Sequence, residues 1–90
     1  MYGESVADVI ITPAAQADFD ALPRVIQGRV LSIFVRLGKW PAVSGAKPLR
    51  GELHGSYRIR TGGWRVIFTP TRDDQTVLVS SIDNRRDAYK

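Results

Sequence analysis

Three arginines alternate with apolar side chains on either side of a Gly-Gly pair in residues 57–68, which read YRIRTGGWRVIF. They are Arg58, Arg60 and Arg65. A guanidinium group suits phosphate because its planar fork donates two parallel hydrogen bonds and keeps its charge at any working pH. Three such groups on one face would bind a phosphodiester backbone and stabilise the extra negative charge of a phosphoryl-transfer transition state. The alternative is that the three charges only keep an exposed sheet soluble.

The Gly62-Gly63 pair predicts a two-residue loop between two antiparallel strands. In the register that this loop sets, Arg60 lies directly opposite Arg65. Like charges in that position destabilise a hairpin by roughly a few tenths of a kcal/mol, so the conflict is typical of a functional site. The arginine face carries Ile67 as its one apolar residue. The other face carries Tyr57, Ile59, Trp64, Val66 and Phe68 and is apolar enough to receive helices.

The basic residues are concentrated in the second half of the chain, which accounts for the whole net charge of +4. Residues 46–90 hold nine of the 13 Lys and Arg residues and five of the nine Asp and Glu residues, whereas residues 1–45 hold four of each kind. Lys47 and Arg50 precede the arginine pattern, and Glu52 is the one acidic residue among them. This distribution favours a polyanionic partner, and Lys47 and Arg50 are expected to bind RNA.

The C-terminal segment, residues 83–90, reads DNRRDAYK and adds further cations and an aromatic ring. If it forms a helical turn, Arg85 and Tyr89 lie at i and i+4 on one side. A tyrosine ring beside phosphate-binding arginines is a platform on which an unstacked base can stack. Arg86 and Lys90 add charge for RNA binding. The alternative is a frayed chain end.

The elements that would position these groups begin with a short β-branched strand at residues 6–11. Thr12 followed by proline is typical of a helix start, with Thr as the N-cap and Pro at the first helical position. This pattern predicts a helix over residues 13–22. Pro23 separates this helix from a clearer one, which Gly38 ends. The second helix has a single apolar stripe, formed by Ile26, Val30, Ile33, Phe34 and Leu37.

Residues 40–48 are expected to form a loop, and three strands follow at residues 57–61, 64–68 and 77–82. The resulting order is β-α-α-β-β-β. We therefore expect an α+β fold, with one small domain over residues 1–90 in which an antiparallel sheet packs one face against a two-helix hairpin. Three further aromatic residues are expected in the core, namely Phe19, Phe34 and Trp40.

Composition excludes several classes of site. The chain has no cysteine and one histidine, so we expect neither a disulfide framework nor a metal centre, and no cofactor. No apolar run approaches the roughly 20 residues that span a bilayer, and no basic-then-apolar leader opens the chain. We therefore expect a soluble, cytoplasmic protein without a membrane partner. A serine hydrolase, a Walker loop and a dinucleotide-binding loop all lack their sequence signatures.

The segment KPLRGELHGSYRIRTGGWRVIF at residues 47–68, together with IDNRRDAY at residues 82–89, resembles the RelE toxins of the RelE/ParE superfamily of type II toxin–antitoxin systems. The resemblance covers nearly the whole chain, and β-α-α-β-β-β is the element order of that family. In this superfamily the RelE branch binds the ribosomal A site and cleaves the mRNA there. The ParE branch has the same fold and inhibits DNA gyrase.

The resemblance implies a role for five residues of this sequence. The family's basic pair falls on Arg58 and Arg60, its phosphate-stabilising arginine on Arg65, its C-terminal arginine on Arg85, and its base-stacking tyrosine on Tyr89. All five positions carry suitable chemistry, which favours the RelE branch. The implied activity is that of a metal-independent endoribonuclease, in which the 2′-hydroxyl of the mRNA attacks the adjacent phosphate and leaves a 2′,3′-cyclic phosphate and a 5′-hydroxyl.

The sequence departs from the family pattern at the basic pair. The best-known member has lysines there, one of which is proposed to take the 2′-hydroxyl proton, whereas Arg58 and Arg60 hardly deprotonate. The spacing between Arg85 and Tyr89 is also shorter than in that member. His54 is a candidate general acid or base, with ribosomal RNA or solvent as alternatives.

The partners implied by the resemblance are the 70S ribosome with its mRNA, and a cognate antitoxin whose partly disordered acidic segment folds over the basic toxin. Operator DNA is expected as a partner only through the toxin–antitoxin complex. Two alternatives remain. One is a non-catalytic inhibitor of DNA gyrase of the ParE type, and the other is a toxin that works only as a DNA-bound co-repressor with its antitoxin.

Overall fold

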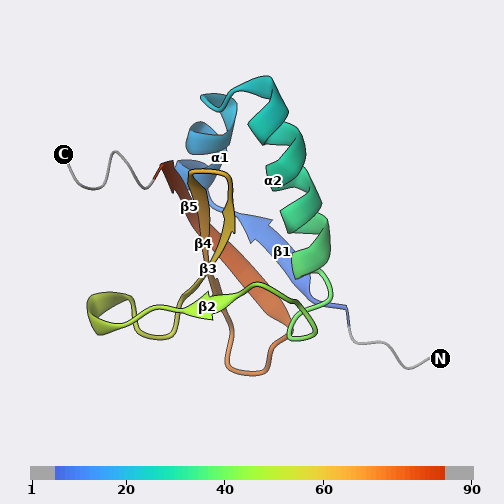
Figure 1. Cartoon of the computed structure of the whole chain (residues 1–90). Coiled ribbons are helices and arrows are strands. Elements are labelled where there is room, and N and C mark those ends of the chain that lie inside the picture. Colours follow the sequence, from blue (N-terminus) through green and yellow to red (C-terminus); the bar gives the residue numbers. More distant parts are fainter. Residues whose placement is uncertain (1–5, 85–90) are drawn as a thin grey trace.

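The computed structural model describes residues 6–84 and places two helices against a five-stranded sheet (Figure 1). The elements follow in the order β1 (Asp8–Ile11), α1 (Pro13–Asp20), α2 (Arg24–Leu37), β2 (Lys47–Pro48), the 3₁₀ turn η1 (Gly51–Leu53), β3 (Tyr57–Thr61), β4 (Trp64–Pro70) and β5 (Thr76–Asn84). Neither helix of this described part is long and apolar enough to cross a membrane.

The strands lie in the order β1-β5-β4-β3-β2. Strands β2 to β5 pair antiparallel, as expected, but β1 pairs parallel with β5. The prediction of a wholly antiparallel sheet is therefore wrong at this edge, because the long connection between β1 and β5 lets the two strands run in the same direction. A second difference is β2, a two-residue edge strand that lies in the segment expected to be loop.

Both helices form where the sequence predicts them. The Thr12 side chain accepts a hydrogen bond from the Ala15 backbone N–H at 3.2 Å, with Pro13 in the first turn, so the predicted N-cap of α1 is confirmed. Helix α2 buries the predicted stripe, with Val30 and Leu37 fully inaccessible to solvent. Figure 1 shows the two helices together on one side of the sheet, where they cover its apolar face.

Gly38 ends α2 by a different mechanism from a left-handed cap. Its φ is −62°, in the right-handed helical region, so the residue does not use the conformational freedom of glycine. Instead, its carbonyl accepts a hydrogen bond from the Ala7 backbone N–H at 2.7 Å. A Cβ atom at this position would lie 3.2 Å from the Val35 carbonyl oxygen. An alanine here would therefore be crowded against the carbonyl oxygen of the preceding helical turn.

Trp40 closes one end of the core. Its ring centroid lies 4.9 Å from that of Tyr57 and 5.4 Å from that of Phe68, with edge-to-face geometry in both pairs. The indole N–H donates a hydrogen bond of 2.9 Å to a carboxylate oxygen of Asp74, on the turn between β4 and β5. This contact ties the segment after α2 to the far end of the hairpin formed by β4 and β5. Phe19 and Phe34 pack against the same core, as predicted.

Candidate functional site

The β3-β4 hairpin has the predicted register. Gly62 adopts a φ of 61° in the loop, a conformation that an L side chain rarely takes. Arg60 is directly opposite Arg65, and Ile59 is opposite Val66. Ile59 and Val66 point into the core, so Arg60 and Arg65 lie on the face of the sheet that the helices do not cover.

The edge strand β2 adds a second pair of like charges to this face. Lys47 is directly opposite Arg58, and side chains of directly opposed residues lie on the same side of a sheet. Lys47 is exposed and Arg58 is half-buried. We call the four residues Lys47, Arg58, Arg60 and Arg65 the basic face. The sequence predicted a contribution of Lys47 to RNA binding, but not its pairing with an arginine of the next strand.

Ile67 lies on the same face and is nevertheless only 4% exposed. In register it is flanked by Arg58 of β3 and Ser81 of β5. Ile67 is therefore a buried apolar residue on the same face of the sheet as the arginines, outside the main core.

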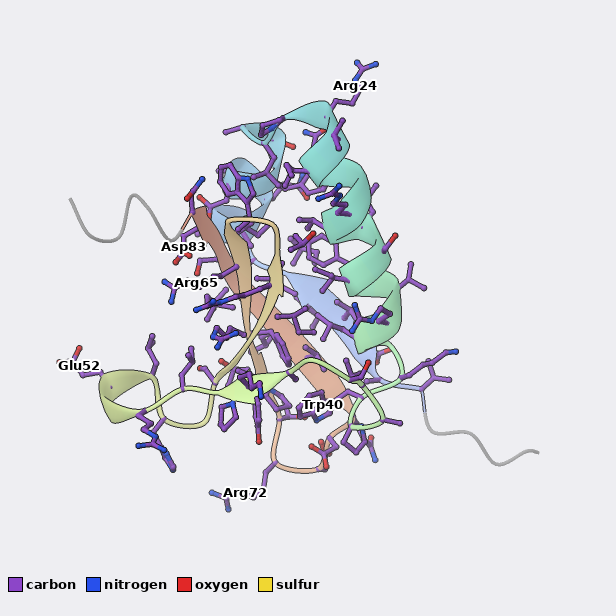
Figure 2. All side chains as sticks on the ribbon, in the orientation of Figure 1. Arg24, Trp40, Glu52, Arg65, Arg72 and Asp83 are labelled. Carbon is purple, nitrogen blue, oxygen red and sulfur yellow. The ribbon has the colours of Figure 1, made fainter. Side chains whose placement is uncertain are left out.

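Arg65 is held by an acidic residue of the neighbouring strand. Asp83 lies directly opposite it on β5, and the Arg65 Nε and Nη2 atoms donate hydrogen bonds of 2.8 and 3.0 Å to the two carboxylate oxygens. Figure 2 shows the two side chains next to each other near the C-terminal end of β5. This bidentate geometry fixes the plane of the guanidinium group. Arg60, Arg65 and Asp83 therefore form one row across three strands.

Two other predicted site residues lie in the loop around η1, and the rest lie outside the described residues. Arg50 and His54 are exposed and flank η1, in a loop that extends away from the helices and the sheet (Figure 1). His54 ends the 3₁₀ turn, and its backbone N–H donates to the Gly51 carbonyl oxygen at 3.0 Å. The remaining predicted residues, Arg85, Arg86, Tyr89 and Lys90, lie outside the described residues 6–84.

Sequence reasoning missed Asp83 as part of the site. In the sequence Asp83 is only the start of the C-terminal segment, because an isolated Asp carries no signal for a partner 18 positions away. Among residues 6–84, no three His, Cys, Asp or Glu side chains come together in a way that could hold a metal ion. Asp73 has a lowered pKa because the Thr71 hydroxyl and the Gln75 backbone N–H donate to its carboxylate, but it lies on the β4-β5 turn.

A family model described as the ParE toxin of the type II toxin–antitoxin system parDE matches residues 9–89. The chain belongs to this toxin family. Toxin RelG of Mycobacterium tuberculosis is 34% identical to the chain over 83 residues, which cover 91% of this chain and 94% of RelG. The predicted membership of the RelE/ParE superfamily is thereby confirmed, and the protein is a toxin of a type II toxin–antitoxin system.

Solved structures of RelE-type toxins have the same fold as this RelE/ParE toxin. A chain in the RelBE2 toxin–antitoxin complex of M. tuberculosis is 30% identical and superimposes with a TM-score of 0.77, over 89% of this chain and 99% of that chain. The isolated RelE toxin of E. coli gives a TM-score of 0.72 at 18% identity, over 87% of this chain and 83% of that chain. At that identity the likeness concerns the fold alone.

Proposed function

We propose that this RelE/ParE toxin is an endoribonuclease that binds the ribosomal A site and cleaves the mRNA there. The observation that carries the proposal is the basic face, on which two pairs of like charges oppose each other across strands. Four cationic side chains on one face of the sheet favour a polyanionic ligand, and Asp83 holds the guanidinium group of Arg65 in place on this face. The similarity to Toxin RelG supports the same interpretation.

The basic face supplies the electrostatic part of the proposed reaction. In that reaction the 2′-oxygen of a nucleotide forms a bond to the adjacent phosphorus, and the bond from phosphorus to the 5′-oxygen of the next nucleotide breaks. Arg58, Arg60 and Arg65 would hold the scissile phosphate and stabilise its growing negative charge. Aligned intramolecular attack lowers a barrier by roughly 7–11 kcal/mol at best, so positioning is the main contribution of the protein.

Two residues of the C-terminal segment complete the proposed site by resemblance to the family. Arg85 would lie near the leaving 5′-oxygen, and Tyr89 would stack on a nucleotide of the A-site codon. Lys47, Arg50, Arg86 and Lys90 would add contacts to the phosphates of the ribosome-bound RNA.

A cognate antitoxin is part of the proposal. Relatives of this chain have been solved as toxin–antitoxin complexes, among them RelBE2 of M. tuberculosis and RelB-RelE of Methanococcus jannaschii. A partner that neutralises a chain of net charge +4 needs an acidic segment, and such a segment can fold as it binds. Operator DNA would be bound through the complex of the two proteins.

The second candidate function is inhibition of DNA gyrase, which the ParE description of the matching family model favours. A pair of assays with the purified toxin separates the two functions. The first is cell-free protein synthesis programmed with mRNA made beforehand, so that it does not depend on DNA topology. The second is supercoiling of relaxed plasmid by purified gyrase.

We expect protein synthesis to stop and supercoiling to continue at the same toxin concentration. The variant Arg65→Ala should lose the effect on protein synthesis, while Arg72→Ala should keep it, because Arg72 lies on the β4-β5 turn at the other end of the sheet (Figure 2). Blocked supercoiling with unimpaired protein synthesis would instead establish the gyrase function.

A further inference from the structure

The proposed reaction needs a group that accepts the 2′-hydroxyl proton, and the basic face offers few candidates. Arg58, Arg60 and Arg65 are always protonated and only donate hydrogen bonds. The ammonium group of Lys47 is likewise a donor. His54 is exposed and ends η1, in a loop that extends away from the helices and the sheet (Figure 1). The described group that both borders the basic face and can take up a proton is the carboxylate of Asp83.

Asp83 is placed by the fold to act beside the phosphate. Its two oxygens lie 2.8 and 3.0 Å from nitrogen atoms of Arg65, the residue proposed to bind the scissile phosphate. The Asp83 side chain is 40% exposed and the Arg65 side chain is 24% exposed, so a ligand on this face can reach the carboxylate. A carboxylate oxygen that accepts one hydrogen bond keeps a further acceptor position, because an ionised carboxylate has about four.

The position of Asp83 is unfavourable for phosphate binding alone. A negative charge next to a phosphate-binding arginine repels the phosphate and competes with it for the same donors. A carboxylate in that position is advantageous when it removes a proton in the transition state, since the proton neutralises it as negative charge grows on the phosphate. The alternative is that the ion pair only joins β4 to β5, which for a partly exposed pair contributes little.

We propose that Asp83 is the general base of this toxin. The proposal rests on the proposed ribonuclease function. The Asp83 carboxylate takes the proton of the 2′-hydroxyl as the 2′-oxygen bonds to phosphorus, and the bond from phosphorus to the 5′-oxygen breaks. The leaving 5′-oxygen takes a proton from water. Asp83 thus ends the step protonated and returns its proton to solvent, while Arg65 stays charged throughout.

The first experiment measures single-turnover cleavage of mRNA on programmed ribosomes by the wild type, Asp83→Asn, Asp83→Glu and the control Asp8→Asn. Asp8 is an exposed residue of β1. Removal of a general base costs about 10²–10⁴-fold in rate, so Asp83→Asn should fall in this range, Asp83→Glu should keep more activity, and Asp8→Asn should cleave like the wild type. Affinity for ribosomes that carry a 2′-O-methyl A-site codon should not fall in Asp83→Asn, because the substitution removes a charge that repels the phosphate.

The second experiment separates proton transfer from positioning by chemical rescue of Asp83→Ala. Acetate and fluoroacetate have similar sizes but different basicities, so acetate should restore cleavage more strongly than fluoroacetate at equal ionic strength. Equal rescue by the two anions, or no rescue by either, would overturn the proposal. So would a wild-type cleavage rate in Asp83→Asn, or a loss of ribosome affinity in this variant as large as its loss of cleavage rate. If the wild type itself leaves the mRNA intact, the proposed ribonuclease function is wrong, and so is the proposal that Asp83 is its general base.

Discussion

The Asp18 carboxylate of α1 accepts a hydrogen bond from the Ile82 backbone N–H of β5 at 2.9 Å. Strand β1 pairs with β5 only as far as Val79, so among residues 6–84 no strand lies beside this edge of β5 beyond Val79. The Thr12 hydroxyl donates to the Val79 carbonyl oxygen at 2.8 Å at the same point. Thr12 and α1 thus supply hydrogen-bond partners to β5 where its pairing with β1 has ended. These contacts fix the segment of β5 that leads to Asp83.

Replacement of Asp18 by alanine should destabilise the fold. Ile82 is 4% exposed, and its backbone N–H would lose a charged acceptor, which costs about 1.5–3 kcal/mol in the free energy of unfolding. Urea denaturation measures the change. The matched control is Asp20→Ala, since Asp20 is exposed and accepts a hydrogen bond only from Gln16 one turn earlier. Its cost should be about 0.2–0.5 kcal/mol, and equal losses in the two variants would contradict this account.

Two glycines of the α2 region should respond differently to substitution by alanine. A Cβ at Gly28 would meet no atom within 4 Å, so Gly28→Ala should stabilise the protein by about 0.5–1 kcal/mol through helix propensity. A Cβ at Gly38 would lie 3.2 Å from the Val35 carbonyl oxygen, so Gly38→Ala should not stabilise it. Thermal unfolding of both variants tests this, and a gain at Gly38 equal to that at Gly28 would show the close approach to be unimportant.

The β4-β5 turn should carry a pH-dependent contribution to stability. Hydrogen bonds from the Thr71 hydroxyl and the Gln75 backbone N–H lower the pKa of Asp73, so they stabilise its charged form. This contribution is present at neutral pH and is lost as the pH falls through the lowered pKa. In Thr71→Ala the pKa of Asp73 should rise toward its ordinary value of 3.8, and this pH-dependent contribution to stability should become smaller. NMR titration of the carboxyl carbon measures the shift, and an unchanged pKa would refute the role of Thr71.

Removal of the Arg58 side chain should impair cleavage without impairing the fold. Loss of one group that stabilises transition-state charge costs about 10²–10³-fold in kcat, so Arg58→Ala should fall in this range, whereas Arg58→Lys should keep part of the activity. The control Arg72→Ala should cleave like the wild type. Circular dichroism and single-turnover cleavage on the same samples separate folding from function. Equal cleavage by Arg58→Ala and Arg72→Ala would remove Arg58 from the site.

Most of the local structure follows from the sequence. The Gly62-Gly63 loop sets the register of β3 and β4 by its length, and with it the opposition of Arg60 and Arg65. The apolar stripe of α2 has the period of a helix, and its members do face the core. In both cases the signal lies within a few residues of the feature that it determines.

The features that sequence reasoning missed all depend on residues far apart in the chain. Strand β2 has two residues and forms only because β3 offers a free edge, so its pattern alone reads as loop. The β1 sequence carries no information on the direction of its neighbour β5. Strand β5 extends to Asn84, two residues beyond the predicted end, because Asp83 and Asn84 pair with Arg65 and Trp64 of β4.

The most direct test of the ribonuclease proposal is a map of the mRNA ends produced on the ribosome. Purified toxin is added to ribosomes stalled on a defined mRNA, primer extension locates the ends, and a sample without ribosomes is the control. We predict cuts within the A-site codon, only in the presence of ribosomes, with 2′,3′-cyclic phosphate on the upstream product. An mRNA that stays intact on the ribosome, with supercoiling by gyrase blocked instead, would contradict the account.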